Sequence, residues 1–375
     1  MMPVDEGAQP KQYFEKLASL RFFAALLVLG SHLPLTWFVA NKTTAFVKND
    51  VLWCGFIGVS VFYVLSGFVI SFANDRWRGW QGYVIGRVAR IYPSHLIVTA
   101  ALFAYPMYHL IQKLADPHSA GVLLTNLGLV HAWVPRDDYF FSLNSVSWSL
   151  SVEVFFYAAF IFLRRLEDRH IYMLAAFGYL ADLTAEILLR GQPVELTHWL
   201  FYINPLMRLP EFLMGMCIFR LYKSGALARL RLPKVEFMLI FIGMIATMTL
   251  LRFHGVDQLY MYSSIPALFA FAMLVALLHE DASRYMKNRV LVLLGESSFM
   301  LYLIHKSLVI YPATARLPYP WMHHIYVALA LVAAIVVLSV VCHVFIEAKA
   351  TRLVRRGLTK LFIREAAGAA DQKIS

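Results

Sequence analysis

The stretch LASLRFFAALLVLGSHLPLTWFVA, residues 17–40, decides the fold, because it is apolar for long enough to cross a lipid bilayer as an α-helix. Its two ionisable side chains are Arg21 and His32. They are eleven positions apart, over which an α-helix turns through roughly 1100°, so both side chains share one face about 16 Å apart along the axis. An ionisable group inside a bilayer costs roughly 2.5 kcal/mol or more, and an aligned pair therefore predicts a polar pathway through the protein. The alternative is an Arg21 that reaches the interface and a His32 bonded to a neighbouring helix.

The composition predicts the class of protein. The 375 residues are 60% hydrophobic and only 15% charged, and the apolar residues fall into repeated blocks. This pattern predicts an all-α, polytopic integral membrane protein. The net charge of +11 arises from basic residues between the apolar blocks, as the positive-inside rule expects, so no nucleic-acid partner is expected. The single cysteines Cys54, Cys217 and Cys342 lack metal-ligand spacing, so neither a metal site nor a disulfide framework is expected.

The apolar blocks predict the topology. We expect about ten transmembrane helices, near residues 17–40, 51–73, 91–112, 147–163, 170–190, 199–222, 235–252, 260–279, 290–312 and 325–347. An even number places both termini on one side of the membrane. The basic connections identify that side as the cytoplasm; they are residues 75–90, 164–169, 223–234, 280–289 and 349–364.

The remaining segments complete the predicted organisation. Residues 120–133 are apolar but too short to span, so we expect a re-entrant or interfacial helix within a long external loop. One membrane domain is expected over residues 17–347, between a cytoplasmic N-terminal segment, residues 1–16, and a basic cytoplasmic tail, residues 348–375.

Paired arginines mark the predicted cytoplasmic surface. Arg87 and Arg90 are three residues apart, so on a helix they project to one side. A guanidinium can bind phosphate oxygens through two hydrogen bonds, which favours a phosphate-rich ligand. The alternative is topology-setting charge attracted to anionic lipid.

A second polar group is predicted in the fourth span. Ser149 and Glu153 are four residues apart and share a helix face, with Trp148 and Tyr157 beside them. This spacing places a carboxylate in the outer half of the membrane, either as a functional group or as a helix-packing contact. We expect helix-packing roles for the further pairs Arg208 with Glu211, Asp182 with Glu186, and His343 with Glu347.

Several motifs occur in order along about nine tenths of the chain. They are Arg21 followed after ten residues by His32, FYVLSGF at 62–68, RVARIYP at 87–93, WSLSVE at 148–153, EFLMG at 211–215, and LGESSF with LYLIH at 294–305. In these motifs the chain resembles the membrane-bound acyltransferase 3 family, and most of all its exopolysaccharide and lipopolysaccharide O-acyltransferases. It departs from the family pattern at Val154, where an acidic residue is usual, and at Ala348, where proline is common.

The resemblance implies an enzyme of the bacterial inner membrane. It implies transfer of an acyl group, usually acetyl, from cytoplasmic acyl-CoA to a hydroxyl of a carbohydrate or related acceptor. Arg21, Arg87 and Arg90 would hold the phosphates of CoA while its pantetheine arm runs inward. His32 would be the general base. Glu153 would orient His32 or bind acceptor hydroxyls.

The weaker candidates concern the acceptor and the course of the reaction. Trp148, Ser149, Tyr157 and His305 are candidates for acceptor binding. Direct attack by the acceptor oxygen is the expected mechanism, and a covalent acyl-histidine is the alternative. Membrane lipids are expected partners, whereas the acceptor, the acyl chain and the oligomeric state stay open. The competing interpretations are a carrier for a sugar or lipid-linked intermediate and a scaffold without chemistry.

Overall fold

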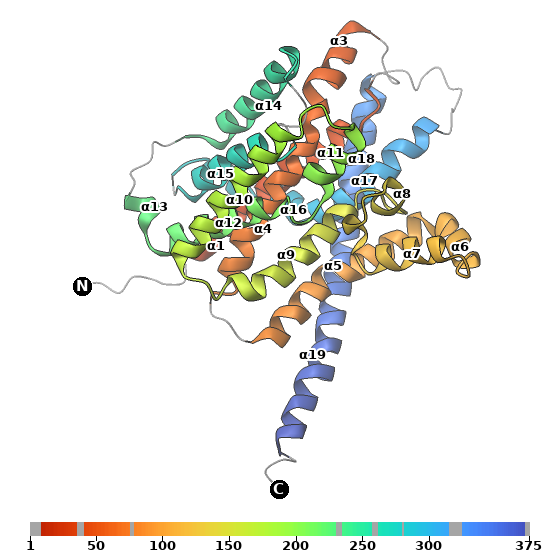
Figure 1. Cartoon of the computed structure of the whole chain (residues 1–375), viewed down its shortest axis with the longest axis vertical. Coiled ribbons are helices and arrows are strands. Elements are labelled where there is room, and N and C mark those ends of the chain that lie inside the picture. The colour runs from red at the N-terminus through yellow and green to blue at the C-terminus, as the bar shows by residue number, and fades with distance from the viewer. Residues whose placement is uncertain are drawn as a thin grey trace.

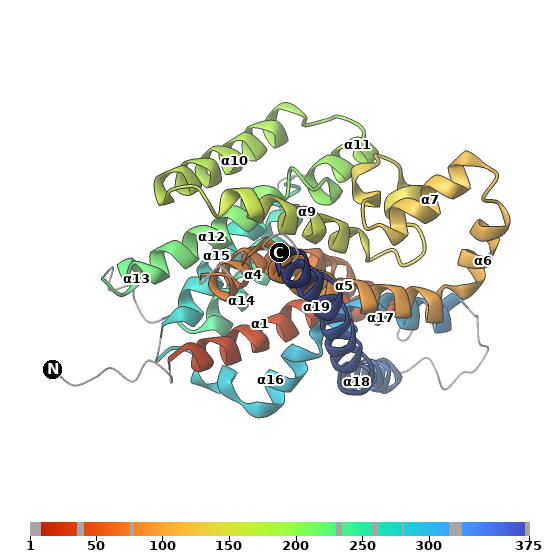
Figure 2. The same cartoon turned by 90° about the horizontal axis from the view of Figure 1, so that it is seen from below.

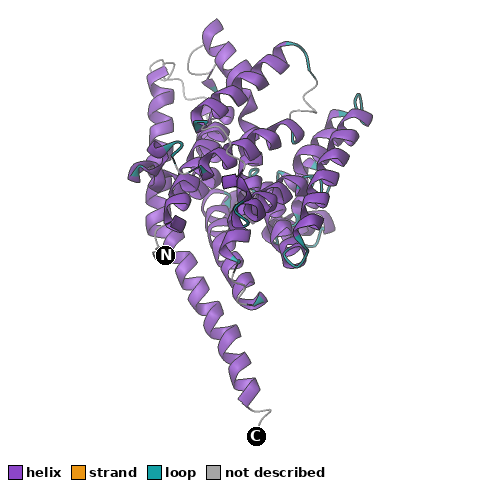
Figure 3. Cartoon of the chain, turned by 90° about the vertical axis from the view of Figure 1, so that its left-hand side faces the viewer, coloured by secondary structure: helices purple, strands orange, loops and turns teal. Residues whose placement is uncertain are grey.

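The computed structural model describes residues 9–35, 41–75, 79–229, 235–256, 262–279, 281–314 and 325–371, and within these ranges the chain is an all-helical bundle (Figures 1 and 3). The all-α part of the predicted fold class is therefore confirmed. The larger helices are α1 Gln9–His32, α4 Ile57–Ala73, α5 Trp80–Leu102, α9 Trp148–Leu163, α10 Asp168–Leu188, α12 Leu209–Lys223, α14 Phe237–Phe253, α15 Ser264–Leu278, α17 Ser298–Thr314, α18 Ile325–Cys342 and α19 Ala348–Asp371. The shorter ones are α3 Lys42–Phe46, η1 Val47–Val51, η2 Leu52–Phe56, α6 Ala104–Gln112, α7 Pro117–Leu127, η3 His131–Trp133, α8 Asp137–Phe140, α11 Val194–His198, η4 Trp199–Ile203, α13 Ala226–Arg229, η6 Arg284–Lys287, α16 Arg289–Glu296 and η8 His343–Glu347.

Several of these helices can cross a membrane. Three continuous helical stretches are long and apolar enough, namely Lys42–Ala73, Asp168–Leu188 and Ile325–Phe362. Two bent pairs, α5 with α6 and α16 with α17, would raise the number to five, and α9, α14 and α15 are shorter apolar helices. The count of about ten spans and the side of the termini stay predictions.

The first helix differs from its predicted bounds at both ends. It begins at Gln9, inside the segment predicted to be a separate N-terminal region. Lys16 is buried, and its ammonium donates to the backbone carbonyls of His279 (2.8 Å) and Ala282 (2.6 Å), just beyond the C-terminus of α15. The helix ends at His32, two residues before Pro34, because a proline disfavours helical backbone in the residue that precedes it. The rest of this predicted span, residues 36–40, lies outside the described residues.

The predicted span 91–112 is wrong in its bounds. α5 already begins at Trp80, so Arg87 and Arg90 lie inside a helix rather than in the connection before it. The chain then turns by 88° between α5 and α6. Pro106 explains the turn, because a proline there cannot donate to the carbonyl four residues earlier and is tolerated only in the first turn of a new helix.

Other predicted segments are also interrupted. The span 290–312 consists of α16 and α17, which meet at an angle of 63°. The span 199–222 consists of η4 and α12, with a non-helical turn between them. The helix expected at 120–133 begins earlier and is shorter, because α7 spans Pro117–Leu127, beside α6 (Figures 1 and 2); its re-entrant or interfacial placement stays a prediction.

Close backbone contacts hold the centre of the bundle together. A Cβ atom on Gly67 of α4 would lie 2.0 Å from the carbonyl oxygen of Phe212, and one on Gly215 of α12 would lie 2.0 Å from that of Val64. Only glycine permits these contacts, as is typical of helix pairs in membrane proteins. The α4–α12 pair therefore fixes the position of Ser66, next to Gly67, relative to its neighbours.

Candidate active site

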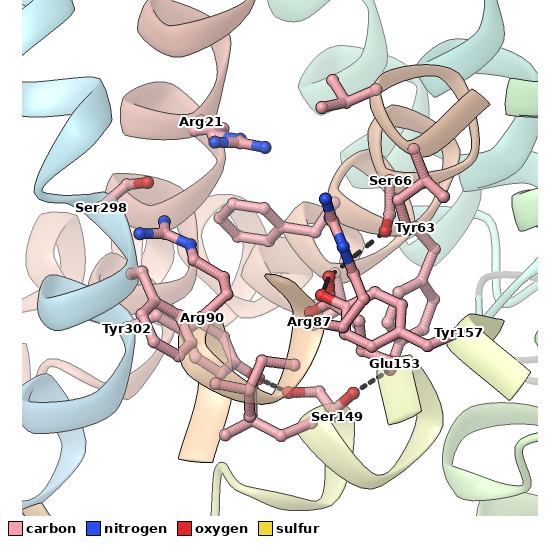
Figure 4. A pocket seen from close by; sticks show the side chains of 17 residues that line it. Arg21, Tyr63, Ser66, Arg87, Arg90, Ser149, Glu153, Tyr157, Ser298 and Tyr302 are labelled. Carbon is pink, nitrogen blue, oxygen red and sulfur yellow. Dashed lines mark hydrogen bonds between the residues drawn. The ribbon is translucent and has the colours of Figure 1, made fainter. Parts of the chain in front are cut away.

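One cavity gathers most of the sequence-predicted site residues (Figure 4). We call it the arginine cavity; it encloses about 110 Å³. It is lined by Arg21, Val59, Phe62, Tyr63, Ser66, Val69, Ile70, Arg87, Arg90, Ile91, Ser149, Leu150, Glu153, Tyr157, Ser298, Phe299 and Tyr302. These residues come from α1, α4, α5, α9 and α17, so segments distant in sequence meet here.

The three arginines differ in how their charge is balanced. Arg87 lies between two aromatic rings, with its guanidinium carbon 5.8 Å from the ring centre of Tyr83 and 5.6 Å from that of Tyr157. Arg90 forms an ion pair with the buried carboxylate of Glu347. Within the described ranges, no hydrogen bond or ion pair engages the Arg21 guanidinium. The arginine cavity therefore carries positive charge that is free to meet an anion.

Glu153 is the one carboxylate among the described residues that line this cavity. Its Oε1 accepts hydrogen bonds from Ser66 Oγ (3.2 Å) and from the hydroxyl of Tyr157 (2.7 Å). Figure 4 shows Glu153 beside Ser66, with Ser149 farther along the cavity, bonded to Tyr302. Glu153 thus accepts hydrogen bonds from two protein hydroxyls and makes none to His32 within the described part of the chain, so of its two expected roles only the binding of acceptor hydroxyls stays a prediction.

His32 contacts a second histidine. Its Nδ1 lies 3.0 Å from the carbonyl oxygen of Val28 and 3.2 Å from Nε2 of His305. His305 is fully buried, and its own Nδ1 lies 2.7 Å from the carbonyl oxygen of Tyr302. His305 was predicted to bind the acceptor, whereas the structure places it against His32 and outside the lining of both cavities described here.

The hydrogen bonds assign the tautomers of the two histidines. A carbonyl oxygen only accepts, so His305 Nδ1 donates to Tyr302, and in the neutral ring Nε2 is then an acceptor. We therefore assign the proton of the neutral His32 ring to Nδ1, which donates to the carbonyl oxygen of Val28 and to Nε2 of His305. The Nε2 atom of a neutral His32 consequently has a free lone pair.

His32 lines a different cavity from the three arginines. This histidine cavity encloses about 280 Å³ and is lined by Val28, Ser31, His32, Trp53, Phe56, Val59, Phe141, Ser145, Val146, Trp148, His198, Tyr202, Tyr262, Tyr302 and Lys306. Trp148, predicted to bind the acceptor, lies here, whereas Ser149 and Tyr157 line the arginine cavity. Val59 and Tyr302 line both cavities and therefore form the boundary between them.

The remaining predicted pairs form. Arg208 and Glu211 make a buried ion pair of 3.0 Å, as expected. Asp182 accepts a hydrogen bond from the hydroxyl of Ser263, just before α15, and Glu186 accepts one from Ser264, its first residue. His343 lies 2.9 Å from Glu347, and the same carboxylate also binds Arg90. Sequence reasoning missed this second contact, because no pattern connects two residues so far apart in the chain.

Within the described ranges, no group of three or more His, Cys, Asp or Glu side chains lies close enough together to hold a metal ion. The described residues offer the chemistry of arginines, hydroxyls, the Glu153 carboxylate and a histidine pair. A cluster of guanidinium groups suits phosphate, and a histidine with a free Nε2 suits removal of a proton from a hydroxyl.

Comparisons with known proteins agree with this chemistry. The chain is 27% identical over 327 residues to the acyltransferase MdmB of Streptomyces mycarofaciens, with 79% of each chain covered. It is 25% identical over 295 residues to the putative acetyltransferase ORF330 of Acidianus two-tailed virus, covering 79% of this chain and 83% of the relative. With the O-acetyltransferase OatA of Staphylococcus aureus it shares 23% identity over 80% of this chain and 51% of the relative.

The family assignment rests on the longest match. No solved structure matches the chain significantly. A family profile described as an acyltransferase domain matches residues 14–344, which is most of the chain and includes every motif quoted above. The resemblance seen in those motifs is confirmed: the chain belongs to the acyltransferase 3 family and is an acyltransferase.

Proposed function

We propose that the protein transfers an acyl group, expected to be acetyl, from acyl-CoA to a hydroxyl of a cell-surface or exported carbohydrate. The observation that carries the proposal is the pair of adjoining cavities, one rich in arginine and one containing His32. Two relatives support the proposal by name: OatA is named an O-acetyltransferase, and only the second name includes an acceptor, the putative peptidoglycan O-acetyltransferase YrhL of Bacillus subtilis, which is 28% identical over 163 residues, 40% of this chain and 23% of that one.

The donor is assigned to the arginine cavity. Coenzyme A carries three phosphates, and Arg21, Arg87 and Arg90 supply guanidinium groups that bind phosphate oxygens well. Arg21 and Arg87 make no ion pair with the described residues, so their charge is available to the donor. We place this cavity at the cytoplasmic side and both termini in the cytoplasm, as the distribution of basic residues predicts.

The acceptor is assigned to the histidine cavity. Its lining includes Trp53, Trp148, Tyr202 and Tyr262, and the ring centres of Trp148 and Tyr202 are 4.7 Å apart. Aromatic faces give a sugar ring an apolar surface to lie on, while polar groups such as Lys306 and the nearby histidines offer hydrogen bonds. We expect the acceptor to enter this cavity from the membrane domain or from the outer face.

The proposed reaction is a direct transfer. The Nε2 atom of His32 removes the proton of an acceptor hydroxyl as the oxygen attacks the thioester carbonyl. The bond between carbonyl carbon and sulfur then breaks, and the CoA thiolate takes the proton from His32. The bonds that Nδ1 of His32 makes to Val28 and His305 hold the ring in the tautomer that this step requires. The products are the O-acyl ester and free CoA.

Release of CoA by the purified protein tests the proposal. Labelled acetyl-CoA and polysaccharide extracted from cells that lack the chain are incubated with the protein, and both free CoA and polysaccharide-bound label are measured. We expect both to form with the wild type, and His32→Ala to lower the rate by about a hundredfold or more while binding of acetyl-CoA persists.

Two outcomes would contradict the proposal. A carrier would move the polysaccharide or its precursor across vesicle membranes and release no CoA. Alternatively, a His32→Ala variant that keeps more than about a tenth of the wild-type rate would remove His32 from the mechanism.

Mass and proton NMR spectra of surface polysaccharide from cells with and without the chain would identify the acceptor.

A further inference from the structure

The boundary between the two cavities is where the acyl group of the donor must lie when the acceptor attacks it. In the proposed function the phosphates of the donor bind in the arginine cavity, whereas the base His32 faces the histidine cavity. Val59 of α4 and Tyr302 of α17 line both spaces. Both are buried, with exposed fractions of 2% and 7%. The thioester carbonyl therefore has to lie beside these two side chains when the acceptor oxygen attacks it.

We propose that Val59 and Tyr302 bound the binding site of the acyl group and select short chains over longer ones. This inference rests on the proposed function, because it needs an acyl-CoA donor. It adds a binding site for the acyl group itself. It also names the side chains that limit the length of the acyl chain.

Val59 is held rigidly against α1. A Cβ atom on Gly58 would lie 2.5 Å from the carbonyl oxygen of Ala24, and one on Gly55 would lie 2.2 Å from that of Leu27. These contacts hold η2 and the start of α4 against the part of α1 that leads to His32. Because the backbones touch, Val59 cannot retreat from His32 to make room for a larger group.

Tyr302 is fixed by hydrogen bonds and by ring packing. Its hydroxyl receives a hydrogen bond from Ser149 Oγ at 2.8 Å and lies 3.3 Å from the carbonyl oxygen of Val146, to which it donates. Its ring lies 5.9 Å from that of Phe62, centre to centre. Figure 4 shows the bond between Ser149 and Tyr302 at the end of the arginine cavity away from Arg21. The Tyr302 side chain is therefore held in place where it lines the two cavities.

Two fixed walls predict selection by size. A pocket of fixed shape distinguishes ligands that differ by one methylene by roughly 10- to 200-fold in kcat/KM. Enlarging the space by two methyl groups should therefore admit a longer chain, and adding one methylene should exclude it more strongly. A change in the same helix at a position that lines neither cavity should do neither.

The test measures kcat/KM for acetyl-, propionyl- and butyryl-CoA with the extracted polysaccharide as acceptor. We expect the wild type to prefer acetyl-CoA, Val59→Ala to raise the propionyl-to-acetyl ratio about tenfold, and Val59→Ile to lower it. Tyr302→Phe keeps the ring and loses both hydroxyl hydrogen bonds, and should raise the ratio by a smaller factor.

Val61→Ala is the matched control. Val61 lies two residues from Val59 in α4, is 3% exposed and is absent from the described lining of both cavities. It should leave the ratio unchanged at a similar melting temperature. Unchanged ratios in both Val59 variants would overturn the inference, and so would an equal shift in Val61→Ala. Absence of CoA release from every donor in the wild type would instead overturn the proposed function, and this inference with it.

Discussion

Replacing His305 tests whether it acts through His32 or on the substrate. The two rings are joined by one hydrogen bond between neutral groups, of 3.2 Å, and His32 keeps a second bond to Val28. A bond of this kind contributes about 0.5–1.5 kcal/mol. If all of that energy acts in the transition state, His305→Ala lowers kcat between about twofold and about thirteenfold. His32→Ala removes the base itself and should cost about a hundredfold or more.

The double variant sharpens this prediction. A residue that acts only by positioning His32 has no effect once His32 is gone, so His32→Ala with His305→Ala should be as slow as His32→Ala alone. His305→Gln keeps an acceptor atom and should recover part of the rate. The assay is the initial rate of CoA release at saturating acetyl-CoA, with the melting temperature as the control for folding.

Two results would refute this reasoning. A loss from His305→Ala as large as that from His32→Ala would make His305 a base or a binding group in its own right. A double variant that is slower than His32→Ala by the full His305 factor would show that the two residues act independently.

Three further predictions follow from the arginines, the helix packing and the topology. Arg87→Ala and Arg90→Ala should each weaken acetyl-CoA binding by the loss of a charged hydrogen bond of roughly 1.5–3 kcal/mol, with partial recovery by lysine; unchanged affinity in calorimetric titrations would reduce them to topology-setting charges. Gly215→Val should lower the melting temperature and the yield of folded protein, because its Cβ would lie 2.0 Å from a carbonyl oxygen of α4; normal melting would show that the two helices can separate without cost. In sealed right-side-out vesicles, an impermeant thiol reagent should label a cysteine introduced at Asp137 but not one at Gly225, and the reverse pattern would invert the topology.

Local patterns predicted the helical class and the helix faces of several residues that line the arginine cavity. The spacing of Arg87 and Arg90, and that of Ser149 and Glu153, indicated shared helix faces, and all four residues line that cavity. These predictions succeeded because the period of a helix depends only on neighbours in the chain. Helix periodicity does not indicate which distant segments meet in one site. That information came from the family resemblance.

The missed features depend on tertiary packing. The spacing of Arg21 and His32 predicted a shared helix face but not that the two residues line different cavities. Val59 and Tyr302 separate the two cavities, and both come from other helices. The contact between His305 and His32 joins residues far apart in the chain. The bend before Pro106 was predictable from proline chemistry, whereas apolar length alone joined α5 and α6 into one predicted span.

The uninterrupted α1 makes the spacing of Arg21 and His32 intolerant of insertions and deletions. One added residue between them would rotate His32 by about 100° and move it by about 1.5 Å, which takes its ring away from His305 and out of the histidine cavity. A whole extra turn would restore the direction and still lengthen the path from the arginines to the base by about 5.4 Å, whereas the pantetheine arm has a fixed length. Homologous enzymes should therefore differ more in which residues stand between these two positions than in the number of those residues.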